Sequence, residues 1–138
     1  MKHFLLMVLL PFFSLCKVSA QSVPDSVNIA ARFGSICCGP DSELFLKDFL
    51  KKFNQGKCRK VIAYKAAGCG KEGEFFILFS LKKLRAARKD FFKMRLEELI
   101  DRENLKNKAE NSSSGGIALQ YNIQLSSLSY CRIPTVKW

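Results

Sequence analysis

The chain has 138 residues, of which 48% are hydrophobic, and 23 Lys and Arg against 12 Asp and Glu give it a formal net charge of +11. This length suffices for one domain and is too short for two, so a large multidomain enzyme is excluded. The excess positive charge points to anionic partners and carries no information about the fold.

Residues 1–20 have the pattern of a secretory signal peptide. A positively charged start and an apolar run over 4–13 are followed by small residues just before Gln21. The apolar run is shorter than the ~20 residues that a bilayer requires, and Pro11 interrupts it. We therefore expect removal of residues 1–20, which leaves 21–138 as a single α+β domain that is secreted or periplasmic and has no transmembrane segment.

The only histidine of the chain, His3, lies in this leader. Histidine is the usual general base near neutral pH and the commonest zinc ligand, so Ser-His-Asp, Cys-His and His-rich metal sites are excluded from the processed chain. Cys16 is lost as well, so five of the six cysteines remain. We expect a non-catalytic protein.

Hydrophobic residues alternate with polar or small ones from Val27 to Phe33, which predicts a half-buried strand. A turn at 39–42 precedes a predicted helix over 42–54, where hydrophobic residues recur at helical spacing until Gly56. A short run over 61–64 and a strand over 75–81 flank a glycine-rich segment at 68–73, the pattern of a hairpin. The strand over 75–81 is apolar on both faces, which is typical of a central position.

A second amphipathic helix is predicted over residues 83 to about 106, with Phe91 and Phe92 on its inner stripe. After a Ser- and Gly-rich connection at 111–116, regular alternation from Ile117 to Leu125 predicts the last strand. The element order is therefore βαββαβ. The simplest closure is a ferredoxin-like two-layer sandwich, in which a four-stranded antiparallel sheet carries two helices on one face.

This topology divides the remaining cysteines between two ends of the sandwich. Cys37, Cys38 and Cys69 fall at one end. Cys58 and Cys131 fall at the other, about 20 Å away across the first helix. Because bridged Cα atoms lie within about 7 Å of each other, we expect Cys58 to pair with Cys131, and Cys69 with Cys37 or Cys38.

An alternative interpretation treats Cys37, Cys38 and Cys69 as a redox or soft-metal cluster beside the first helix, whose N-terminal dipole favours thiolate. The position of Cys37 and Cys38 between the first strand and the first helix resembles that in heavy-metal-associated domains, which share the βαββαβ order. The resemblance implies a soft ion such as Cu(I), and no other cofactor is expected. Those domains place two residues between their cysteines, whereas Cys37 and Cys38 are adjacent.

Positive charge gathers around the start of the second predicted helix, in Lys82, Lys83, Arg85, Arg88, Lys89 and Lys93. Cations in the first turn oppose the helix dipole, so helix stability does not explain them. One interpretation is a solvated face that keeps the protein soluble. The other is a contact surface for an anionic ligand, a glycan or an acidic protein. Further lysines and an arginine could assist, namely Lys51, Lys52, Lys57, Arg59 and Lys60.

Export, and the absence of aromatic residues interleaved with basic ones, disfavour nucleic acid as the partner. We therefore predict a small exported binding module that contacts an anionic partner through this cationic helix face.

Overall fold

The computed structural model describes residues 26–110 and 114–138, so the predicted signal peptide lies outside the described residues. The elements, in chain order, are β1 (Ser26–Ser35), α1 (Leu44–Asn54), β2 (Ile62–Ala67), β3 (Phe75–Ser80), α2 (Ala86–Ala109), β4 (Ser114–Gln124), the 3-10 helix η1 (Leu125–Leu128) and β5 (Ile133–Lys137).

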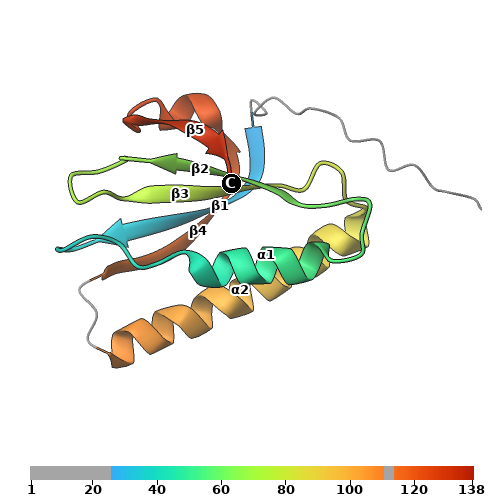
Figure 1. The fold of residues 1–138 in the computed structure, drawn as a ribbon, viewed down its shortest axis with the longest axis horizontal. Coiled ribbons are helices and arrows are strands. Elements are labelled where there is room, and N and C mark those ends of the chain that lie inside the picture. The colour runs from blue at the N-terminus through green and yellow to red at the C-terminus, as the bar shows by residue number, and fades with distance from the viewer. Residues whose placement is uncertain (1–25, 111–113) are drawn as a thin grey trace, which may run out of the picture.

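The strands form one antiparallel sheet in the order β4-β1-β3-β2-β5, and both helices lie against the same face of it (Figure 1). The α+β class and the antiparallel sheet with two helices are thus as predicted. The predicted number of four strands is wrong, because β5 pairs with β2 and adds a fifth strand at that edge.

The segment between β4 and β5 crosses the sheet, since these two strands are its opposite edges. On the way, Leu128 of η1 becomes buried against the face that the helices leave uncovered, together with Tyr64, Phe76 and Leu78. The helix-covered face contributes a second set of buried residues, among them Ile77 and Phe79. The central strand β3 is therefore buried on both faces, as its apolar sequence predicts.

Both helices bury one stripe against the sheet. Leu46 of α1 and Leu96 of α2 are fully buried, and the ring of Phe92 lies 5.0 Å from the ring of Phe53 and 5.5 Å from that of Phe79. Phe91 does not join this core and is 51% exposed, so its prediction as an inner residue is wrong. None of the helices in residues 26–110 and 114–138 combines the length and the apolar character needed to span a membrane.

In each helix, one asparagine side chain binds the backbone at or just before the strand that follows. The amide of Asn54 donates to the carbonyl oxygen of Val61 and accepts from its N–H, both at 2.9 Å. Asn104 makes the same pair of bonds with Ile117, at 2.8 and 2.9 Å. Because a side-chain amide offers a donor and an acceptor side by side, each asparagine pairs with the backbone as a neighbouring strand would.

Candidate functional site

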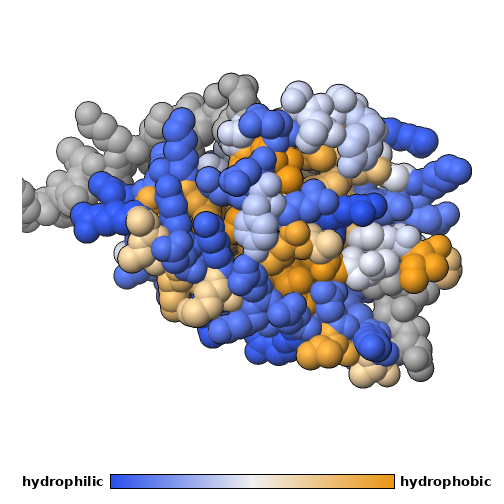
Figure 2. Space-filling model, turned by 180° about the vertical axis from the view of Figure 1, so that it is seen from behind, coloured by the Kyte–Doolittle hydropathy of each residue, from blue (hydrophilic) through white to orange (hydrophobic). Residues whose placement is uncertain are grey.

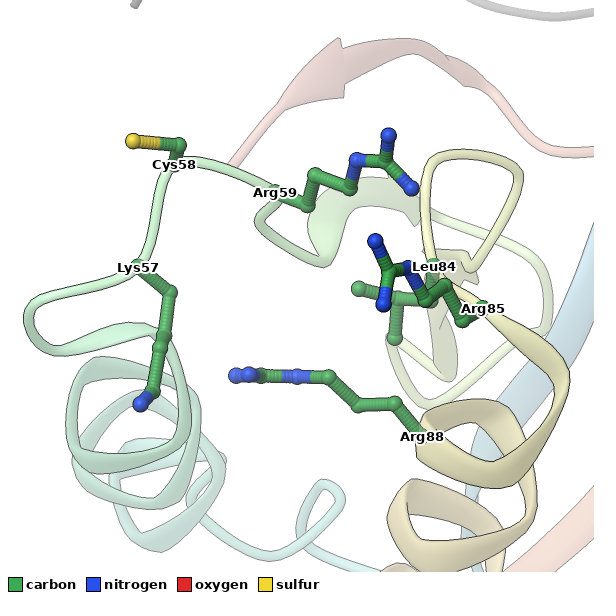
Figure 3. Close-up of a pocket in the computed structure, with 6 residues that line it drawn as sticks. All are labelled: Lys57, Cys58, Arg59, Leu84, Arg85 and Arg88. Carbon is green, nitrogen blue, oxygen red and sulfur yellow. The ribbon is translucent and has the colours of Figure 1, made fainter. Parts of the chain in front are cut away.

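Cationic side chains surround a pocket of about 380 Å³ at one end of the helical layer (Figure 3). The loop between α1 and β2 contributes one side, and the turn before α2 with its first helical turn contributes the other. The lining residues are Lys57, Cys58, Arg59, Leu84, Arg85 and Arg88.

Local structure explains why these two segments face each other. The bonds between Asn54 and Val61 close the loop 55–60, which carries Lys57 and Arg59. On the opposite side, the buried Leu84 anchors the turn before α2. The helix then begins immediately after Arg85. Arginine side chains therefore project from the rim, while an apolar residue forms part of the wall.

Arg88 connects the two helices. Its Nη2 donates to the carbonyl oxygen of Phe53 at 2.9 Å, and its guanidinium carbon lies 4.7 Å from the centre of the Phe53 ring. Its Nε is buried and has no acceptor among the described residues. The guanidinium is thus held in place by α1 while one of its N–H groups is not satisfied by the described part of the protein.

The charges of the pocket are not neutralised by carboxylates of the described residues. The ion pairs among the described residues involve none that line the pocket. They are Lys65 with Glu43, Arg95 with Glu98 and Lys106 with Glu103. The first turn of α2 contains no acidic residue, so the partial positive charge of the helix N-terminus adds to that of the side chains. The pocket lining therefore carries an excess of positive charge.

The structure brings together only part of the predicted cationic face. Arg85 and Arg88 line the pocket, whereas Lys82 and Lys83 lie in the exposed turn before α2, and Lys89 and Lys93 are half-buried on the helix outside the lining. Two of the residues predicted to assist, Lys57 and Arg59, complete the pocket from another element. The cations of this pocket therefore come from two segments and not from one face of a helix.

A second hollow, of about 730 Å³, is lined by α1 and by other residues of the same loop. Its lining includes Lys51 and Lys52 of α1 with Gly56 and Lys60 of the loop, and one acidic residue, Asp48. The C-terminal part of α1 and the loop that follows it thus contribute cations to two hollows.

Seen from behind the view of Figure 1, the surface is largely hydrophilic, with hydrophobic groups between the polar ones (Figure 2). A polar and charged surface is expected at a net charge of +11. The pocket is distinguished from this general surface by its concave shape and by the convergence of cations from two segments.

The predicted pairing of Cys58 with Cys131 is wrong, because Cys131 is bonded to Cys69, with a Cα–Cα distance of 4.0 Å. Cys58 is disulfide-bonded too, but not to Cys131. The reason lies in β5: it runs antiparallel to β2, with Ile133 opposite Ala67, so the residues before β5 lie beside the end of β2. The disulfide is compatible with an extracellular location.

The second predicted bridge, from Cys69 to Cys37 or Cys38, is wrong for the same reason. The Cys69–Cys131 bond also removes Cys69 from the alternative cluster of three thiols. Cys37 and Cys38 remain as exposed thiols, and the Sγ of Cys38 donates a hydrogen bond to the Sγ of Cys37 at 3.2 Å. Within the described residues, no group of three or more His, Cys, Asp or Glu side chains is arranged to hold a metal ion.

No protein-family model matches the chain, and neither a curated protein nor a solved structure shows significant similarity to it. The function proposed below therefore rests on the geometry and charge of the site.

Proposed function

We propose that this protein is a small, exported, non-catalytic binding module that holds an anionic group in the pocket formed by Lys57, Arg59, Arg85 and Arg88. The observation that carries the proposal is the convergence of these four cations on one hollow without a carboxylate partner among the described residues. Cations that only served solubility would have no reason to converge from two segments on a concave site.

The side chains favour sulfate or phosphate groups as ligands. Guanidinium groups present planar pairs of N–H donors that match the oxygens of such groups, and the lining contains three of them. The adjacent hollow with Lys51, Lys52 and Lys60 extends the positive surface beyond one anionic group. A linear polyanion therefore fits better than a single small anion, and a sulfated or phosphorylated glycan is the polyanion that suits an exported protein.

Two features support export, and the strand order supports the inferred fold. The leader over 1–20 and the Cys69–Cys131 disulfide both suit an oxidising compartment. The part of the sheet with the order β4-β1-β3-β2, together with α1 and α2, suits a ferredoxin-like core to which β5 has been added. In this interpretation the pocket lies at the end of the core where α1 ends and α2 begins.

The test is retention of the protein on immobilised heparin, a sulfated glycan, for the wild type and the double variant Arg59→Glu/Arg85→Glu. Both side chains are exposed, so the variant should keep its fold. Hydrogen bonds to charged groups contribute about 1.5–3 kcal/mol each, so we expect affinity for soluble heparin to fall at least about tenfold and elution to shift to lower salt.

The matched control is Lys71→Glu/Lys108→Glu, which changes the net charge equally at two exposed positions outside the pocket lining. This variant should lose much less affinity than the pocket variant. Equal losses in the two variants would show that retention depends on net charge alone, and the pocket would then have no specific role.

A further inference from the structure

Cys37 and Cys38 lie at the opposite end of α1 from the cationic pocket, in the connection that follows β1. The thiols are exposed and their sulfur atoms are 3.2 Å apart. The S–S bond of a disulfide is about 2.0 Å long, so the two sulfurs are neighbours that have to approach by roughly 1.2 Å to become bonded.

The backbone at this point is already unusual. Cys38 has a φ of +65°, in the left-handed region that residues other than glycine rarely adopt, and Gly39 follows at +96°. Consecutive Cα atoms are about 3.8 Å apart, closer than in most disulfides. A bond between neighbouring cysteines is therefore strained, and strained, exposed disulfides are the ones that are readily reduced.

We propose that Cys37 and Cys38 form a reversible redox site, in which the two thiols close to a vicinal disulfide on reaction with a low-molecular-weight disulfide and reopen on reaction with the corresponding thiol. The inference is independent of the anion-binding function, since the two cysteines do not belong to the cationic pocket.

The hydrogen bond between the two thiols indicates which cysteine reacts first in the thiol–disulfide exchange. Cys38 is the donor and Cys37 the acceptor, so Cys37 is the sulfur placed to act as the thiolate. This thiolate attacks one sulfur of the small disulfide, forms a mixed disulfide and releases one thiolate. The sulfur of Cys38 then gives up its proton and attacks the Sγ of Cys37, which expels the second small thiol. The protein loses two electrons and two protons, and one small disulfide becomes two thiols.

The surroundings of Cys38 agree with its role as the second nucleophile. Its hydrogen bond to Cys37 is the main cause that raises the pKa of the Cys38 thiol above the ordinary value, and the negative charges of Cys37 and Glu72 act in the same direction. Glu72 belongs to the hairpin between β2 and β3, and its carbonyl oxygen lies 4.0 Å from the position that a Cβ atom on Gly39 would take. The proton of Cys38 is therefore retained until Cys37 has reacted.

The test is mass mapping after mild reduction and incubation with oxidised glutathione. Cleavage after Arg32 and Lys47 gives a peptide, residues 33–47, that contains Cys37 and Cys38 and no other cysteine. We expect this peptide to lose two hydrogen atoms and to become inert to an alkylating reagent, and added reduced glutathione should restore two alkylatable thiols.

Single variants provide the controls. In Cys38→Ser the reaction should stop at a stable glutathione adduct on Cys37, and in Cys37→Ser an adduct on Cys38 should form several-fold more slowly. The proposal is overturned if the wild-type peptide accumulates glutathione adducts or links to a second chain without the loss of two hydrogen atoms.

Discussion

Single polar side chains connect neighbouring elements of this small protein. Arg88 is the clearest case: its guanidinium packs on Phe53 and donates to the carbonyl oxygen of that residue, and the same group lines the cationic pocket. Arg88 therefore contributes to folding as well as to the site. Substitutions of the more exposed Arg59 and Arg85 report on binding more cleanly for this reason.

A second such contact makes a prediction about pH. The phenol of Tyr121 on β4 donates to a carboxylate oxygen of Glu97 on α2, and this hydrogen bond, helped by desolvation and by the negative charge, raises the pKa of Tyr121 to about 12. The neutral phenol is the form that the folded protein favours. The stability that this contact gives to the folded state is therefore fully present below about pH 10, the ordinary pKa of tyrosine. It is lost as the pH rises towards 12.

Titration of phenolate absorbance checks this assignment in the wild type and in Glu97→Ala. The variant should show one tyrosine whose pKa returns towards about 10. Identical titration curves for the two proteins would show that Glu97 does not hold the phenol in solution.

At the scale of elements, periodicity could predict the helices and the strands that contact the core on a regular face. The alternation from Ile117 to Leu125 identifies β4, and the doubly apolar run over 75–81 identifies the central strand β3. The strand β5 has only five residues, lies at an edge and contains Pro134, so neither alternation nor length marks it. Because the sequence pattern does not reveal β5, it also does not reveal that Cys131 lies beside the end of β2, next to Cys69.

The candidate site could be predicted only in part for a similar reason. A run of cations in the sequence identifies Arg85 and Arg88, because they are close along the chain. The position of Lys57 and Arg59 across from them depends on how the loop after α1 is closed by Asn54, which is a tertiary contact. Sequence periodicity carries no information about such a closure.

The two asparagine contacts allow this closure to be tested. Asn54→Ala and Asn104→Ala each leave a backbone residue (Val61 or Ile117) without two hydrogen bonds, so each should lower the free energy of unfolding by about 1–3 kcal/mol, measured by urea denaturation. Only Asn54 closes the loop that carries Lys57 and Arg59. Asn54→Ala should therefore also weaken heparin binding, and Asn104→Ala, of similar instability, should not. Equal binding by both variants would contradict the role of Asn54 in shaping the pocket.

At the scale of the whole molecule, the Cys69–Cys131 disulfide joins residues 62 positions apart and encloses β3, α2 and β4. Closing a loop of this length removes chain entropy from the unfolded state, which corresponds to about 4 kcal/mol. The bond also fixes the start of β5 beside the end of β2, so it stabilises a short edge strand that contains a proline.

Cys69→Ala/Cys131→Ala should therefore lower the free energy of unfolding by about 4 kcal/mol in chemical denaturation. Cys37→Ser/Cys38→Ser is the control and should leave stability nearly unchanged, since both thiols are exposed. A loss below about 1 kcal/mol in the first variant would show that the sheet keeps its fifth strand without the covalent link.

The position of this link has a practical consequence for anyone handling the protein. A protease that cuts the backbone once between residues 69 and 131 produces two pieces that stay covalently joined. On a gel run without reductant such nicked protein would migrate as one band, so integrity has to be judged after the sulfur bridge has been broken.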